Sequence, residues 1–191
     1  RVDRRQRQMC IRDRYNCINS IYQNIQIENF EIIVVDNGST DDSVQNIKQL
    51  FSDIVIITNE TNVGYSGGCN IGAQNAKGKY LLFLNNDTEH SKEWVEKLVN
   101  FLDSHPDAFA VQPKILNIKN REYFDYAGGS GGFLDHYGFP YVKGRIFNTL
   151  EKDTGQYDKA SEIFWSSGAA MMVRGDTVSY THLTLPTIYS V

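Results

Sequence analysis

Short apolar runs alternate with amphipathic segments through the first 115 residues of the chain. Three continuous runs of β-branched, aliphatic and aromatic residues predict buried strands, at 31–35 (EIIVV), 54–58 (IVIIT) and 80–84 (YLLFL). A fourth strand is predicted at 109–115. Strands separated by helical patterns predict an α/β fold, in which a mostly parallel sheet carries helices on both faces.

Helical signals lie between these strands. An apolar stripe predicts a short helix over 17–22, and Ser39 with Asp42 forms a capping signal for a helix that ends near residue 50. The glycine-rich stretch 62–72 is expected to lead into a helical turn that ends near residue 78. Ser91 is expected to cap a further helix, whose apolar stripe is Trp94, Leu98 and Leu102.

The second half of the chain is patterned differently. Residues 120–159 are rich in glycine, tyrosine and aspartate, and their periodicity is weak. We expect long loops with short strands there, the part of a domain that usually carries specificity. Residues 1–14 and 179–191 match neither half, and we expect both ends to be non-native, which leaves a domain of residues 15–178. The alternative is a frayed basic tail and a last β-strand.

Charge is unevenly distributed and excludes one class of partner. Residues 1–14 hold six arginines and two aspartates, a net charge of +4, whereas the remainder has a net charge of −8. A body this acidic is a poor partner for a phosphate backbone, so we expect no nucleic-acid binding. No apolar run approaches the ~20 residues that span a bilayer. The three cysteines form neither a disulfide framework nor a metal-spaced pair, which favours a cytoplasmic protein.

Two carboxylates follow buried strands directly. Asp36 comes after EIIVV and Asp87 comes after YLLFL. Because parallel strands bring their carboxyl ends to one edge of a sheet, we expect both to line one crevice. Asp36 is either a turn residue or an acceptor for a nucleotide's ribose or base. Asp87 is either a capping or turn aspartate or a ligand of Mg²⁺ or Mn²⁺, which would offset a diphosphate charge in this acidic protein.

Other chemical signals are weak. The glycines at 64, 67, 68 and 72 do not have the G-x-G-x-x-G spacing of dinucleotide-binding proteins. Asn85 and Asn86 are turn residues or sugar contacts. The histidines at 90, 105 and 136 lack metal spacing, and we expect them to be surface or loop residues. No Ser-His-Asp arrangement is visible.

Four segments in this order resemble the family 2 glycosyltransferases of GT-A fold. They are EIIVVDNGSTD (31–41), NVGYSGGCNIG (62–72), LLFLNNDTE (81–89) and WSSGAAMMVR (165–174). The closest similarity is to the bacterial rhamnosyltransferase-like group that builds cell-envelope polysaccharides. The resemblance implies that Asp87 binds the metal as the last residue of a D-x-D motif, with Asn85 in the first position. The nucleotide and donor sugar would contact Asp36, Asn37, Gly38, Asn62, Gly64, Asn85, Asn86, Gly168 and Ala169.

The resemblance also implies a reaction. It predicts sugar transfer with inversion from a nucleotide-diphosphate sugar, dTDP-rhamnose or a UDP-sugar, to a glycan or lipid-linked acceptor. Peripheral association with the inner membrane through the acceptor and a place at the cytoplasmic face would follow. The family's first strand and the acidic segment that supplies its catalytic base have no counterpart in this sequence, so we assign no catalytic base. Two alternatives are an inactive nucleotide-sugar-binding fragment and a nucleotidyltransferase.

Overall fold

The computed structural model describes residues 4–126, 129–180 and 188–190. Residues 1–3, 181–187 and 191 of the two ends predicted to be non-native lie outside this part, and the origin of both ends stays a prediction. The elements follow one another as α1 (Arg4–Asn24), β1 (Ile33–Asp36), α2 (Ser43–Leu50), β2 (Val55–Thr58), α3 (Gly64–Asn75), β3 (Tyr80–Leu84), α4 (Trp94–Ser104), β4 (Ala110–Gln112), β5 (Gly132–Leu134), β6 (Pro140–Val142), β7 (Arg145–Ile146), β8 (Thr149–Leu150), β9 (Ser161–Ile163), β10 (Ala170–Arg174), the 3₁₀ helix η1 (Gly175–Tyr180) and β11 (Ile188–Ser190).

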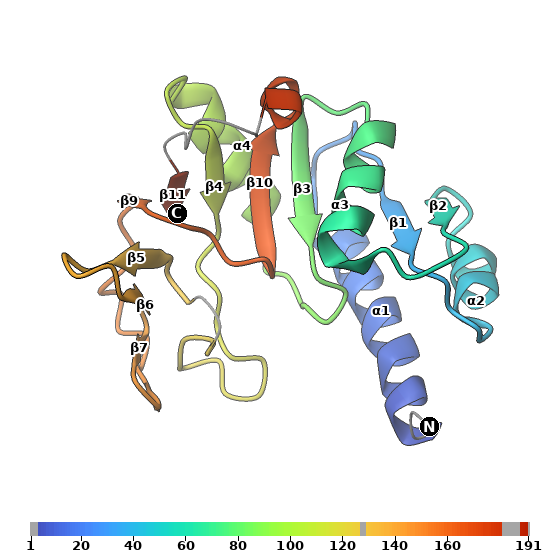
Figure 1. The fold of residues 1–191 in the computed structure, drawn as a ribbon, viewed down its shortest axis with the longest axis horizontal. Helices are drawn as coiled ribbons and strands as arrows, with labels where there is room; N and C mark the ends of the chain where they lie inside the picture. Colours follow the sequence, from blue (N-terminus) through green and yellow to red (C-terminus); the bar gives the residue numbers. More distant parts are fainter. Residues whose placement is uncertain (1–3, 127–128, 181–187, 191) are drawn as a thin grey trace.

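The strands of the central layer form two sheets (Figure 1). β1 and β2 pair in parallel, as predicted. The second sheet has the order β3-β10-β4-β11-β9. β10 is antiparallel to both β3 and β4, which therefore run in the same direction. The predicted α/β fold is confirmed, but this sheet is mixed and not mostly parallel. Residues 120–159 return the chain to the edge at which β3 ends, and β10 starts at that edge and runs antiparallel to β3.

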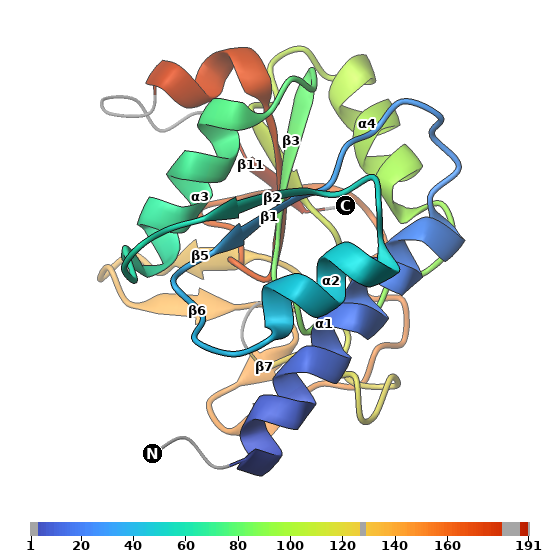
Figure 2. The same cartoon turned by 90° about the vertical axis from the view of Figure 1, so that its right-hand side faces the viewer.

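Helices cover both faces of the central layer, as predicted. Seen along the layer, α3 lies on one side of β3 and α4 on the other (Figure 2). The glycine-rich stretch was expected to lead into a helix, but it is itself the helix α3. Its glycines allow a close approach to β1: a Cβ on Gly68 would lie 3.2 Å from the Asn37 side chain, and one on Gly72 would lie 3.3 Å from Val35.

The main core lies between α4 and the five-stranded sheet. Trp94, Leu98 and Leu102 are buried there with Val111 and Met172, so the predicted apolar stripe is confirmed. The predicted cap at Ser91 is wrong. Helix α4 begins after Glu93, which has a left-handed backbone (φ +59°) and accepts a hydrogen bond from the amide of Lys97 at 3.1 Å through its carbonyl.

Arg174 closes the other end of α4. Its guanidinium donates to the carbonyl oxygens of Leu102 at 2.6 Å, His105 at 2.9 Å and Ala108 at 2.9 Å. These bonds satisfy carbonyls that a helix leaves without partners at its end. Arg174, the last residue of the WSSGAAMMVR segment, therefore joins β10 to α4 and has a structural role.

The amino-terminal helix is longer than predicted. α1 covers Arg4–Asn24 instead of 17–22 and crosses the predicted domain boundary between residues 14 and 15. Arginine and glutamine have high helix propensity, so a helix forms without an apolar stripe. Tyr22 stacks on Phe51 beyond α2, with ring centroids 5.8 Å apart. Asp42 is the N-cap residue of α2, as predicted, but its side chain makes no capping hydrogen bond; the carboxylate of Asp41 accepts from the amide of Ser43 at 3.2 Å.

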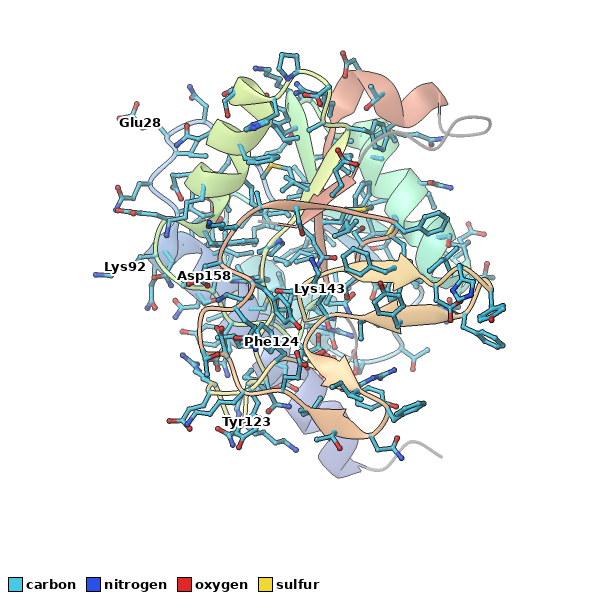
Figure 3. The ribbon with its side chains drawn as sticks, turned by 90° about the vertical axis from the view of Figure 1, so that its left-hand side faces the viewer. Glu28, Lys92, Tyr123, Phe124, Lys143 and Asp158 are labelled. Atoms are coloured by element: carbon cyan, nitrogen blue, oxygen red, sulfur yellow. The ribbon has the colours of Figure 1, made fainter. Side chains whose placement is uncertain are left out.

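Residues 120–159 form short hairpins and loops, as predicted. β5 pairs with β6 and β7 pairs with β8, both antiparallel. Phe124 is fully buried beneath them, and Figure 3 shows this side of the molecule with Phe124 and Lys143 labelled. Among the described residues, no helix has the length and apolarity needed to cross a membrane.

Candidate functional site

The carboxyl end of β1 forms a tight turn. The buried carboxylate of Asp36 accepts a hydrogen bond from the amide of Ser39 at 3.0 Å, and the Asp36 carbonyl accepts from the amide of Asn59 at 2.8 Å. Gly38 has φ +80°, and a Cβ there would lie 3.4 Å from the carbonyl oxygen of Asn59. Asp36 therefore lies in a tight turn that leads to α2 and fixes the loop after β1 against the end of β2, whereas its role as a nucleotide acceptor stays a prediction.

Asn37 joins this turn to the start of α3. Its amide nitrogen donates to the Gly64 carbonyl at 3.1 Å, and its side-chain oxygen accepts from the side chain of Asn59 at 2.9 Å. Asn62 lies beside them and accepts the amide hydrogen of Gly64 at 2.8 Å. Both asparagines thus position the first turn of α3, whose free amide groups and helix dipole create positive potential.

Tyr65 connects α3 to the segment that leads into β10. Its hydroxyl donates to the Gly168 carbonyl at 2.7 Å. Partial burial and the neighbouring Cys69 raise the pKa of Tyr65 to about 12, which keeps the hydroxyl protonated and able to donate. The next residue, Ala169, accepts the backbone amide hydrogen of Asn85 at 3.0 Å. The sequence did not single out Tyr65; its place within the glycine-rich segment was the available signal.

A continuous chain of contacts therefore links the ends of β1 and β3. It runs through eight of the nine residues predicted to contact the donor: Asp36, Asn37, Gly38, Asn62, Gly64, Gly168, Ala169 and Asn85. The ninth, Asn86, is exposed in the turn after β3. The structure thus brings the predicted segments to one edge of the central layer, across its two sheets, whereas their contacts with a ligand stay a prediction.

Asp87 follows in the same turn and suits a metal that is shared with a substrate. Its side chain is exposed and makes no hydrogen bond or ion pair with any residue of the described part. No group of three histidine, cysteine or acidic side chains gathers as a metal site in residues 4–126, 129–180 and 188–190. Mg²⁺ commonly takes one or two protein carboxylates and completes its shell with water and substrate phosphates. A single free carboxylate fits that arrangement.

A buried polar layer from α1 lies beneath this turn. The hydroxyl of Thr88 donates to the Asn85 carbonyl at 2.9 Å, and Cys17 lies 3.5 Å from the same oxygen. Burial raises the pKa of the Cys17 thiol. His90 lies between Ser20, with Nδ1 2.6 Å from its hydroxyl oxygen, and Thr88, with Nε2 3.1 Å from its hydroxyl oxygen. The Ser20 hydroxyl also donates to the Cys17 carbonyl at 2.9 Å, so both hydroxyl groups beside His90 are bonded to backbone carbonyls.

His90 was expected to be a surface or loop residue. It is in a loop, but it is largely enclosed and stacks on Trp94 with ring centroids 4.6 Å apart. The residues near His90 in the sequence do not indicate this enclosure, because its partner Ser20 lies 70 residues away. Burial lowers the pKa of His90 to about 4, so the imidazole is neutral in the folded protein.

This shift predicts that the protein loses stability in mild acid. An unfolded histidine has a pKa of 6.5, above the folded value of about 4, so unfolding takes up a proton below pH 6.5. His90 therefore lowers the free energy of unfolding progressively between pH 6.5 and 4, by up to about 3 kcal/mol. Chemical denaturation across this range measures the effect. The His90→Gln variant should lose this component, and the control His136→Gln, at an exposed loop position, should keep it; equal pH dependence of the two variants would contradict the assignment.

Together, the α/β layers and the polar edge define a GT-A-like domain with a candidate ligand site at the ends of β1 and β3. The model of the family described as glycosyl transferase family 2 matches residues 15–173, and the chain belongs to this family. The predicted resemblance is thereby confirmed at the level of the family.

Bacterial relatives agree with this assignment. An uncharacterized glycosyltransferase of Haemophilus influenzae is 38% identical over 100 residues, which cover 51% of this chain and 33% of the relative. The Escherichia coli protein UDP-Glc:alpha-D-GlcNAc-diphosphoundecaprenol beta-1,3-glucosyltransferase WfaP is 30% identical over 103 residues, covering 50% of this chain and 41% of the relative. The matched segments thus span less than half the length of these relatives.

Solved structures show the same fold. GalNAc-T7, determined with UDP, GalNAc and Mn²⁺, matches with a TM-score of 0.66 and 16% identity over 92% of this chain and 38% of the other. Residues 1–349 of S. aureus TarS match with a TM-score of 0.63 and 16% identity, over 95% of this chain and 55% of the other. At this identity the likeness supports the fold alone.

Proposed function

We propose that this chain is the donor-binding part of an enzyme that transfers a sugar from a nucleotide-diphosphate sugar to a glycan or lipid-linked acceptor during cell-envelope polysaccharide synthesis. The observation that carries the proposal is the chain of contacts described above. It joins the end of β1, the start of α3, the end of β3 and the start of β10. It places a carboxylate turn, a helix amino end and a free carboxylate along one edge of the central layer. Family membership supplies the reaction class.

Each part of the edge has a proposed role. The β1 turn, with Asp36, Asn37 and Gly38, would hold the nucleoside. Asn62 and Gly64 would bring the amino end of α3 toward the diphosphate, where amide groups favour negative charge. Gly168 and Ala169, with Asn85 and Asn86, would line the sugar. Asp87 would hold Mg²⁺ or Mn²⁺, which as a Lewis acid stabilises charge on a departing diphosphate.

The transfer we propose is a single displacement with inversion. An acceptor hydroxyl oxygen attacks the anomeric carbon, the bond from that carbon to the diphosphate oxygen breaks, and the nucleoside diphosphate leaves. The acceptor proton passes to a carboxylate base, for which we assign no residue. Work at the cytoplasmic face of the inner membrane would suit a lipid-linked acceptor.

Two donors are the candidates. The resemblance of the four segments to rhamnosyltransferase-like proteins favours dTDP-rhamnose. The similarity to the E. coli glucosyltransferase WfaP, with 30% identity, favours a UDP-sugar. Assaying release of UDP and of dTDP from UDP-glucose and dTDP-rhamnose, with and without a lipid-linked acceptor, separates them. A nucleotidyltransferase would instead release pyrophosphate from a nucleoside triphosphate.

Asp36 offers a variant for this assay. Replacing it by asparagine keeps the size of the side chain and removes the charge that holds the Ser39 amide. We expect the KM for the donor to rise about tenfold. This is the effect of losing one charge-assisted hydrogen bond, here the one between the Asp36 carboxylate and the donor. Asp41, whose carboxylate bonds Ser43 on the α2 side of the loop, provides the control variant Asp41→Asn, with less than a threefold change expected. An unchanged KM for Asp36→Asn would remove the β1 turn from the donor site.

A further inference from the structure

Two hairpins of the irregular half share a rigid base. Lys143 and Gly144 join β6 to β7, and the Lys143 amide donates to the Gly131 carbonyl at 3.1 Å while the Gly144 carbonyl accepts from Glu151 at 2.9 Å. Fully buried Phe124 packs under this joint, so closely that a Cβ on Gly144 would lie 2.5 Å from it. The base of both hairpins is therefore held in the fold.

The tips of the same hairpins expose apolar side chains. Around the β5–β6 turn, Tyr137 is 76% and Phe139 is 68% exposed. In the β7–β8 hairpin, Ile146 is 60% and Phe147 is 90% exposed. Soluble domains rarely gather exposed large apolar residues in one place unless the surface binds something. None of these four side chains contributes to either core cluster of the described residues.

Phe147 has a second unusual property. It occupies the first position of the two-residue turn between β7 and β8, with a left-handed backbone at φ +51°. Glycine or asparagine normally takes such a position, because a bulky side chain strains the backbone there. A phenylalanine that is strained and almost fully exposed does not stabilise the fold.

We propose that the β7–β8 tip, together with the β5–β6 tip, inserts into the interface of an anionic lipid bilayer. Residues 132–150 contain one aspartate, one lysine and one arginine, a net charge of +1, in a chain whose net charge is −4. A segment with a small net positive charge in an acidic protein therefore carries these exposed aromatic tips. Aromatic and aliphatic side chains flanked by basic residues are the usual composition of interfacial membrane anchors.

The geometry favours lipid over a carbohydrate. Ile146 and Phe147 are consecutive and exposed, so the tip presents an aliphatic and an aromatic side chain together. A sugar stacks on the face of an aromatic ring and gains little from an isoleucine beside it, whereas a tip with aliphatic and aromatic side chains fits insertion into acyl chains. The hairpin also projects beyond the sheet edge at which β3 ends, on the side of the candidate site (Figure 1).

Vesicle co-sedimentation tests the proposal without any enzymatic assay. The chain is mixed with vesicles of phosphatidylethanolamine and phosphatidylglycerol, and the partition coefficient is compared with that of Ile146→Thr/Phe147→Asn. We expect the double variant to bind at least about tenfold more weakly. Leu50→Ser on α2 removes an equally exposed aliphatic residue, 60% exposed, and should bind within twofold of the parent. The basic residues 1–14 are the same in all variants, so their attraction to anionic lipid cancels.

A second readout locates the tip. Phe147→Trp should be quenched by lipids brominated on the acyl chain, and asparagine at 147 should leave the thermal midpoint unchanged or higher, because it tolerates a left-handed backbone. The proposal fails if the parent does not bind these vesicles, if the double variant binds as well as the parent, or if the introduced tryptophan is not quenched. It also fails if the double variant keeps vesicle binding and loses binding to a soluble oligosaccharide. Donor release by a chain that does not bind vesicles would leave the proposed function intact.

Discussion

Replacing Asp87 by alanine is expected to lower kcat/KM for sugar transfer by at least about a thousandfold, because the leaving diphosphate loses the cation that stabilises its charge. The side chain is exposed and makes no hydrogen bond or ion pair with the described part of the chain, so its removal leaves the fold intact. The loss should therefore come without a change in the thermal midpoint. Steady-state kinetics with a titration of Mn²⁺ and Mg²⁺ measures it in the enzyme that contains this chain.

Glu89 supplies the matched control. It is an exposed carboxylate two residues further on, and it pairs with Arg121 instead of standing free. Glu89→Ala removes the same charge from almost the same place, so a general electrostatic effect would appear in both variants. We expect less than a threefold change for it. Full activity of Asp87→Ala, or equal losses of activity in the two variants, would show that Asp87 does not bind the metal.

Replacing Gly132 by alanine is expected to destabilise the protein by about 3 kcal/mol. A Cβ at this position would lie 1.9 Å from the ring of Trp165, so the ring or the strand must move. The two residues also bond through the backbone, with the Gly132 amide donating to the Trp165 carbonyl at 3.0 Å. Trp165 leads directly into Gly168 and Ala169, so the displacement should weaken donor binding as well. Thermal unfolding should show a midpoint lower by about 6–12 °C.

Gly138→Ala separates crowding from backbone effects. Gly138 has φ +85°, but nothing lies within 4 Å of the place a Cβ would take. It should cost about 1 kcal/mol, the strain of a left-handed alanine. Comparable stabilities of Gly132→Ala and Gly138→Ala would show that Trp165 is not packed on β5.

The sequence predicts the strands of the central layer well, because continuous apolar runs such as EIIVV have few alternatives to a buried strand. For the same reason it places Asp36 and Asp87 at the ends of β1 and β3, since both follow such runs. It predicts a helical turn after the glycine-rich stretch but not that this stretch itself forms the helix α3. Glycine has low helix propensity, and Gly68 and Gly72 are favourable there only because β1 approaches them closely, a contact that no local pattern contains.

Other features depend on contacts between distant segments. His90 and Ser20 meet only once α1 lies beneath the turn after β3. Arg174 acts on carbonyls 66–72 residues earlier in the chain, and nothing near it in the sequence indicates that role. The start of α4 after Glu93 was missed because Ser91 offered the usual capping residue, whereas the left-handed backbone of Glu93 precedes the helix instead.

Calorimetric titration of the chain with UDP and with dTDP, in Mn²⁺ and then in EDTA, tests the central claim that this edge binds the diphosphate of a nucleotide sugar. The account predicts saturable binding of at least one nucleotide that weakens at least about tenfold when the cation is removed, and that Asp87→Ala in Mn²⁺ matches the parent in EDTA. Absence of binding by a folded chain, or binding that neither EDTA nor Asp87→Ala affects, would contradict it.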